Sequence, residues 1–240
     1  MKTSVLVQDK ISCFPKGYVF TYVEFCTQVS KKEAVIKHLN RMVERGDISK
    51  LSKGKYYKSQ ETIFGTLLPD QYQIVKDLIG KRDNITGYLT GYSYFNSMGL
   101  TTQVSNVIQI AKNETRPATK RGSFKILFIK QKNLINKENI PLLRILDALR
   151  FIKKIPDTNI DTSCVIIKKI LKNLNTNELF LIQKLALKYP PSTRALLGAL
   201  LELNNQKIVG SLKKSLNPIT QYNLGISEKT VPTINNWNII

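Results

Sequence analysis

The feature that most constrains this fold is a close series of helix and turn signals at the N-terminus. Residues 5–14 carry apolar side chains at helical spacing, and Pro15 and Gly17 follow them, which predicts a first helix that ends there. Thr21 and Glu24 have the spacing of a capping box, in which the hydroxyl and the carboxylate each accept a backbone amide hydrogen. This pair predicts a short second helix directly after the first.

A second capping box follows a few residues later and predicts the longest helix of the region. Ser30 and Glu33 form this box, and the helix should continue to about residue 45. Its apolar positions fall on one stripe: Val35, Leu39, Met42 and Val43. Its other face is polar and mostly cationic: Lys37, His38, Arg41 and Arg45. Two capped helices joined by a tight connection at residues 27–29 are typical of a helix-turn-helix.

A basic hairpin is expected directly after this helix. Residues 48–51 and 55–58 have the pattern of short strands, and Gly54 between them permits the positive φ of a tight turn. The lysines expected on this hairpin are Lys50, Lys53 and Lys55. A Gly-tipped basic hairpin after a capped basic helix predicts that residues 1–60 form a winged helix-turn-helix domain.

The charge of the chain points to a polyanionic partner. The 37 lysines and arginines outnumber the 17 aspartates and glutamates, which gives a formal net charge of +20. Residues 1–58 alone hold 12 basic and 5 acidic residues. With 42% hydrophobic residues in a chain of 240, the charge must coat a folded core, which excludes a disordered basic tail.

Pattern and charge together predict that the N-terminal domain binds double-stranded DNA. In the usual docking of such a domain, the second helix of the helix-turn-helix enters the major groove with its first residues near the base edges. We expect Lys31, Lys32 and Glu33 to contact bases. Lys37, Arg41 and the hairpin lysines should contact phosphates. The complete set of expected DNA-binding residues is Ser30, Lys31, Lys32, Glu33, Lys37, Arg41, Lys50, Lys53, Gly54 and Lys55.

Beyond residue 60 the pattern changes to mixed helix and strand, so a second domain is expected over residues 61–240. Its strands should lie mostly within residues 85–130, and its first helices and strands are expected at 71–79, 85–88, 91–98, 106–110 and 125–129. Thr90 should cap the helix that follows it. The expected class is α+β, with an N-terminal winged helix-turn-helix, a mixed α/β domain and a helical C-terminal part.

The helical C-terminal part is expected between residues 141 and 203. Apolar residues recur there at helical spacing in four segments: 141–154, 163–174, 177–189 and 192–203. Pro190 and Pro191 should separate the last two. Residues 204–240 lack strong periodic runs and predict an irregular tail, with one short helix near 208–216 and Trp237 packed against the body.

A basic cluster occurs on one of these predicted helices. Its members are Lys168, Lys169 and Lys172. Such a cluster can extend a DNA contact or meet an acidic protein, and an ordinary solvated helix face explains it equally well.

The sequence offers little material for a disulfide framework, a metal site or a membrane span. Cys13, Cys26 and Cys164 are scattered, so we expect small buried thiols. No apolar run approaches the ~20 residues that a membrane helix needs. Asp9 and Lys10 interrupt the segment in which a signal peptide would be apolar. We therefore expect a cytoplasmic protein with no membrane contact, no metal and no cofactor.

Signatures of catalysis are also weak, and we expect a protein that is not an enzyme. Neither a glycine-rich phosphate loop nor a nucleophile elbow occurs. The chain has a single histidine, His38, and we expect it to lie on an exposed helix face without a specific role. Asp157 and Asp161 are the only close acidic pair in the second half. They leave a metal-dependent nuclease as a remote alternative.

Four segments carry a resemblance to a known family. They are Lys-Leu-Ser-Lys-Gly-Lys-Tyr-Tyr at 50–57, Gly-Tyr-Leu-Thr-Gly-Tyr at 87–92, Met-Gly-Leu-Thr-Thr-Gln-Val at 98–104 and Tyr-Pro-Pro-Ser-Thr-Arg-Ala-Leu-Leu-Gly-Ala-Leu at 189–200. Together they resemble the AbiEi-type antitoxins of type IV toxin–antitoxin systems, over most of the chain. The first segment is general to winged helices, whereas Gly-Leu-Thr-Thr-Gln and Arg-Ala-Leu-Leu-Gly are more specific.

The resemblance implies a bacterial antitoxin of an abortive-infection system. Its N-terminal domain would repress its own operon by binding inverted repeats in the promoter. Its C-terminal domain would counter a nucleotidyltransferase-like toxin, with or without stable binding. Candidate positions for contact with the toxin or with a second stretch of DNA are Lys168, Lys169, Lys172 and Arg194. The main alternative is a stand-alone winged-helix regulator whose second domain senses a ligand.

Overall fold

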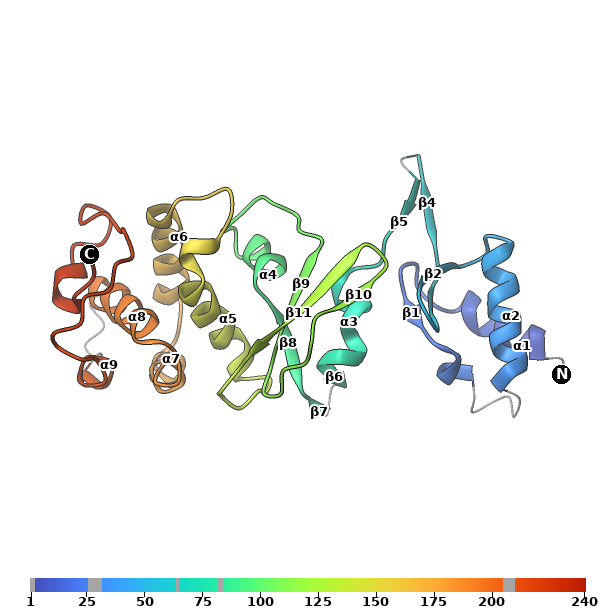
Figure 1. Ribbon diagram of the computed structural model, residues 1–240, viewed down its shortest axis with the longest axis horizontal. Coiled ribbons are helices and arrows are strands. Elements are labelled where there is room, and N and C mark those ends of the chain that lie inside the picture. The colour runs from blue at the N-terminus through green and yellow to red at the C-terminus, as the bar shows by residue number, and fades with distance from the viewer. Residues whose placement is uncertain (1–2, 26–31, 64, 82–83, 205–209) are drawn as a thin grey trace. The chain divides into compact units, whose positions relative to one another are not determined.

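The computed structural model describes residues 3–25, 32–63, 65–81, 84–204 and 210–240, and it is a mixed α and β protein (Figure 1). Contacts within the chain group it into two compact units. The first is Met1–Asp77 with Lys120–Phe124, and the second is Leu78–Thr119 with Lys125–Ile240. The domain boundary expected near residue 60 falls inside the first unit.

The first unit begins with a helix and continues with alternating short strands and helices. Its elements up to residue 57 are α1 (Thr3–Ser12), β1 (Val19–Phe20), the 3-10 helix η1 (Tyr22–Phe25), α2 (Lys32–Glu44), β2 (Ser49–Ser52) and β3 (Lys55–Tyr57). A second hairpin follows, formed by β4 (Gln60–Thr62) and β5 (Gly65–Leu67). Helix α3 (Gln71–Ile79) forms where the sequence predicts a helix, but it begins in this unit and not in the second one.

A small antiparallel sheet of order β1-β3-β2 packs with the helices of this unit around one core. Phe20 on β1 is paired in register with Tyr56 on β3, and both side chains are buried. The predicted apolar stripe of α2 is confirmed, because Val35, Leu39 and Met42 are buried in the same core. The core members are Val7, Ile11, Phe20, Phe25, Val35, Leu39, Met42, Ile48 and Tyr56.

The predicted cap at Thr21 is present with a different hydrogen-bond pattern. The backbone N–H of Thr21 donates to the Glu24 carboxylate at 2.8 Å, as a capping box requires. The Thr21 hydroxyl oxygen, however, accepts from the N–H of Val23 at 3.2 Å. The cap therefore opens the 3-10 turn of η1.

An ion-pair cluster around Asp77 fastens the turn at Lys120–Phe124 to the first unit. The Arg121 guanidinium binds both carboxylate oxygens of Asp77, the longer contact being 2.8 Å, and Lys55 Nζ donates to the same carboxylate at 2.9 Å. Partial burial alone would raise the pKa of Asp77, but the hydrogen bonds from Arg121 and Lys55 outweigh it and lower this pKa.

A four-stranded sheet has the order β10-β11-β9-β8, with β9 and β11 parallel and β8 and β9 antiparallel. Its strands are β8 (Gly87–Thr90), β9 (Val107–Lys112), β10 (Thr119–Arg121) and β11 (Phe124–Lys130). Strands β6 (Gly80–Lys81) and β7 (Asn84–Ile85) form a separate hairpin, and α4 (Tyr92–Ser97) follows β8. The strands predicted at 106–110 and 125–129 are therefore confirmed.

The prediction that Thr90 caps α4 is wrong. The cap residue is Gly91, at φ +67°, and the side-chain oxygen of Gln109 accepts from the backbone N–H of Tyr92, the first residue of α4, at 3.1 Å. Thr90 is instead buried and its hydroxyl donates to the carboxylate of Asp147 at 2.8 Å. The hydroxyl is therefore directed to the buried carboxylate, and its oxygen accepts no backbone N–H from the first turn of α4.

The helices of the C-terminal part follow the predicted order. They are α5 (Asn139–Arg150), the 3-10 turn η2 (Ile152–Lys154), α6 (Ile160–Lys172), α7 (Thr176–Ala186), α8 (Pro191–Leu203), α9 (Gly210–Lys214) and the 3-10 turn η3 (Ile234–Trp237). Asn159 caps α6, and Asn175 forms a complete capping box with Glu178 at the start of α7. Pro190 is the N-cap of α8 and Pro191 is its first residue, so the two prolines mark the break between α7 and α8, as predicted.

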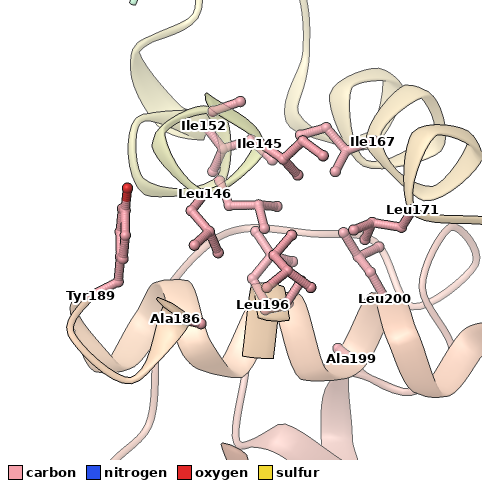
Figure 2. Packing of buried hydrophobic residues seen from close by; sticks show 14 of the residues in the cluster. Ile145, Leu146, Ile152, Ile167, Leu171, Ala186, Tyr189, Leu196, Ala199 and Leu200 are labelled. Atoms are coloured by element: carbon pink, nitrogen blue, oxygen red, sulfur yellow. The ribbon is translucent and has the colours of Figure 1, made fainter. Parts of the chain in front are cut away.

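The core of the second unit lies between α5, α6 and α8 (Figure 2). Leu146 on α5 points toward Leu196 on α8, and Leu171 on α6 points toward Leu200 on α8. The C-terminal tail also packs against this core. Trp237 is 1% exposed, and it packs so closely against α8 that a Cβ atom at Gly198 would lie 2.2 Å from its ring. The predicted anchoring role of this tryptophan is confirmed.

A buried polar network around Asp147 joins elements that are far apart in the sequence. Asp147 on α5 is 1% exposed and accepts hydrogen bonds from Tyr88 and Tyr189, each at 2.8 Å, as well as from Thr90. Gln131 Nε2 donates to both tyrosine oxygens, at 2.9 and 2.8 Å. Burial raises the pKa of Asp147, while these donors oppose that effect. The network joins β8, α5, the segment after β11 and the connection between α7 and α8 to one another.

The described cysteines divide into two kinds. Cys164 is buried, and burial together with nearby Asp161 raises the pKa of its thiol to about 12. Cys13 is exposed, so the expectation of a buried thiol is wrong there, because the turn after α1 leaves it at the surface. Cys26 lies outside the described residues. Among the helices described, none has the length and apolar character needed to cross a membrane.

We predict that Asp147→Asn lowers the free energy of unfolding by about 3 kcal/mol, because the amide nitrogen cannot accept a hydrogen bond and leaves a buried hydroxyl without an acceptor. Urea unfolding followed by circular dichroism measures this change. Asp157→Asn is the matched control, since Asp157 is exposed at φ +55°, a conformation that asparagine tolerates. An Asp147→Asn protein as stable as the control would contradict the structural role of the network.

Candidate nucleic-acid interface

The outer face of α2 presents a row of polar and charged side chains to solvent. Residues three and four apart line an open groove along the helix: Glu33, Ile36, Lys37, Asn40, Arg41 and Glu44. Lys37 and Arg41 are exposed and one helical turn apart. The opposite face is held in the core by Val35, Leu39 and Met42. The amphipathic pattern thus fixes which side of α2 faces outward.

Asn40 belongs to this face, although the sequence analysis did not select it. It is exposed, and its side-chain oxygen accepts a hydrogen bond from the Tyr56 hydroxyl at 2.8 Å. This bond leaves the amide N–H₂ on the outer face and orients it. Its helical spacing from Lys37 and Arg41 was the signal that could have identified it.

Two of the side chains expected to contact bases lie at the start of α2. Lys32 and Glu33 are both exposed, and the Lys32 ammonium lies 4.7 Å from the ring centroid of Tyr22, a cation–π contact with η1. Two further candidates for DNA contact, Ser30 and Lys31, lie outside the described residues.

The prediction of a fully exposed His38 is wrong. This side chain is half-buried, and its Nε2 atom is covered and has no hydrogen-bond partner among the described residues. Burial, followed by the positive charges of Arg45 and Arg41, lowers the pKa of His38. His38 is therefore neutral near pH 7 and does not add to the positive charge of α2.

The hairpin of β2 and β3 has the predicted turn. Gly54 adopts φ +72°, and Lys50 and Lys53 are exposed. Lys55 differs, because its ammonium group is held by the Asp77 carboxylate. The expectation that Lys55 is free to contact phosphate is therefore wrong: α3 supplies a carboxylate that the local pattern did not reveal.

Four exposed cations of the first unit lie on the two elements that are predicted to contact DNA. Lys37 and Arg41 lie on α2, and Lys50 and Lys53 lie on the hairpin. None of these four forms an ion pair with another residue of the described ranges, whereas Arg45 is paired with Asp47 at 3.0 Å. Unpaired, exposed lysine and arginine side chains can bind phosphate oxygens and release counterions from a nucleic acid.

In the second unit, the candidate cations of α6 and α8 differ from one another. Lys169 and Lys172 are exposed on α6, and Lys168 is half-buried. Arg194 is half-buried, and its Nη1 atom donates to the backbone oxygen of Ser215 at 2.8 Å. The idea that Arg194 presents its charge to a partner is therefore wrong, because this arginine fastens α8 to the segment after α9.

Asp157 and Asp161, the acidic pair considered for nuclease chemistry, do not form a shared site. Asp161 accepts a hydrogen bond from the backbone N–H of Ser227 at 2.9 Å, and Asp157 is exposed in a turn. Within the part of the chain that the structure describes, histidine, cysteine, aspartate and glutamate side chains nowhere form a group of three able to hold a metal ion.

Comparisons with known proteins place the chain in a family. No curated protein matches it significantly. The fold is similar to the crystal structure of the Rv2827c protein from Mycobacterium tuberculosis, with a TM-score of 0.56 and 13% identity, over 92% of this chain and 82% of that one. At this identity the likeness concerns the fold alone. Residues 6–179 match the profile described as a family of unknown function (DUF6088), and the chain therefore belongs to that family.

Proposed function

We propose that the N-terminal part of this protein is a winged helix-turn-helix that binds double-stranded DNA. The observation that carries the proposal is the element order of the first unit, in which helix α2 is followed at once by the Gly54-tipped basic hairpin. The sheet order β1-β3-β2 and the helices α1, η1 and α2 agree with this architecture. The connection between η1 and α2 lies outside the described residues.

In this proposal α2 enters the major groove and the hairpin contacts the backbone beside it. Lys32, Glu33 and Asn40 are the described side chains suited to base edges, since asparagine pairs with adenine and lysine with guanine. Lys37, Arg41, Lys50 and Lys53 contact phosphates, and such contacts set affinity rather than sequence preference. Lys55 is excluded, because Asp77 holds it.

We further propose that the protein is an antitoxin of a bacterial type IV toxin–antitoxin system, which represses its own promoter in the cytoplasm. The support is the resemblance of the segments at 87–92, 98–104 and 189–200 to AbiEi-type antitoxins. The C-terminal unit then counters a nucleotidyltransferase-like toxin. This role needs no catalysis and no cofactor of the antitoxin itself.

The first prediction concerns the hairpin. Lys50→Ala with Lys53→Ala should weaken binding to every duplex alike and reduce the slope of log K against log salt by about 2, because each lost phosphate contact removes ~0.9 from the slope. Gel shifts on the chain's own promoter and on a scrambled duplex, over a salt series, measure both effects. Lys184→Ala with Lys229→Ala removes two exposed charges from the second unit and is the control. An unchanged slope in the hairpin variant would contradict the proposal that this hairpin is a DNA-binding wing.

The second prediction concerns base contacts from α2. Lys32→Ala with Glu33→Ala should reduce the preference for the promoter over the scrambled duplex by ~1–3 kcal/mol for each lost base contact. The same competition gel shift at one salt concentration measures this preference. The hairpin variant serves as the contrast, since it should retain the preference while losing affinity. Equal loss on both duplexes would show that these residues do not contact bases.

The third prediction tests the antitoxin role. Growth inhibited by a nucleotidyltransferase-like protein encoded beside this gene should be restored when the full chain is co-expressed. The Lys50→Ala, Lys53→Ala variant should still restore growth while failing to repress a promoter reporter, because neutralisation belongs to the other unit. Failure of the wild-type chain to restore growth, with repression intact, would favour a stand-alone regulator.

A further inference from the structure

A strongly cationic pocket lies in the second unit, at the end of β11. Its cavity is about 260 Å³ in volume. One wall is formed by Lys130, the last residue of β11, and by Gln131 and Lys132, which follow it. The others are Arg150 at the end of α5 and the residues that lead into α8, Lys188 and Tyr189 among them. The carboxyl end of a parallel strand is a common place for ligand binding.

The charge of this pocket is one-sided. Lys130, Lys132, Arg150 and Lys188 line it, and the lining includes no acidic residue. These four cations form no ion pair with any residue in the described ranges. Like charges that converge on a concave surface repel one another and concentrate the positive potential there. An anion in the pocket would relieve this repulsion.

The floor of the pocket is rigid. Gln131 and Tyr189 are 4% and 6% exposed, and Gln131 donates to the Tyr189 oxygen, which in turn donates to Asp147. The backbone N–H of Gln131 also donates to the Lys112 oxygen at 2.8 Å. These hydrogen bonds hold the backbone next to the cations in place before a ligand binds. Preorganisation of this kind favours binding.

Two further details suit a phosphate group. Lys188 Nζ lies 3.4 Å from the backbone oxygen of Lys132, which holds this ammonium group beside the chain after β11. Pro191, the first residue of α8, also lines the pocket, and this 13-residue helix has no acidic residue in its first turn, so the positive end of its dipole adds to the field.

We propose that this pocket binds the phosphate groups of a small phosphorylated ligand. Arginine and lysine are the side chains that bind phosphate oxygens, and four of them converge here. The volume is close to the lower end of small-molecule pockets, about 300 Å³, which fits a diphosphate or the phosphate end of a nucleotide. This proposal does not depend on the DNA-binding role of the first unit.

Isothermal titration calorimetry of the full chain with inorganic pyrophosphate, in chloride buffer at fixed ionic strength, tests the proposal. We expect saturable binding to one site in the wild type. Lys132→Gln with Arg150→Gln should weaken it about tenfold or more, since two charge-assisted contacts are lost. The matched control is Lys169→Gln with Lys172→Gln, which removes the same charge from the exposed face of α6 and should change the affinity less than about twofold.

Three results would overturn the proposal. The first is no saturable binding of pyrophosphate by the wild type. The second is an equal loss in the control variant, which would indicate a general effect of net charge. The third comes from a scrambled duplex: if the pocket variant loses duplex binding that the control retains, and pyrophosphate competes for it, the pocket contacts a nucleic-acid backbone. Thermal unfolding of both variants establishes that they are folded, and Lys188→Gln provides a second test of the same pocket.

Discussion

The second unit depends on the hydrogen bonds that the carboxylate of Asp147 accepts. Asp147 is almost fully buried on α5, and its donors are Tyr88, Thr90 and Tyr189. A charged or polar group at this depth is tolerated only when its partners are in place, so the sheet and the helices must meet in one arrangement. Tyr189 also lines the cationic pocket. Fold and pocket are therefore held by one set of hydrogen bonds.

Much of the secondary structure could be predicted because its signals are local. The helical spacing of Val35, Leu39 and Met42 was enough to place the buried face of α2, and the Gly54 turn was visible in a few residues. The breaks at Pro190 and Pro191 likewise follow from the chemistry of proline alone. The strands β9 and β11 were visible as short apolar runs, although their parallel pairing was not.

The contacts that define the sites could not be predicted, because they join residues distant in the sequence. Thr90 looked like a helix cap until Asp147, which is 57 residues away, proved to be its acceptor. Lys55 looked free until Asp77 on α3 was found beside it. Helical spacing places a residue on a face of its own element but says nothing about the partner that the rest of the chain brings to it.

The net charge of +20 is consequently a poor guide to the binding surface. Several cations are occupied by the protein itself: Lys58 donates to the Ser12 and Phe14 oxygens, and Lys112 donates to the Leu78 oxygen. These ammonium groups satisfy backbone carbonyls and stabilise the fold. Cations without a carboxylate partner within the described ranges lie on many parts of the surface, and two groups of them border a groove or pocket: those on α2 and those after β11. We therefore propose distinct anion-binding surfaces in the two units, and the variants in each unit test its surface separately from the other.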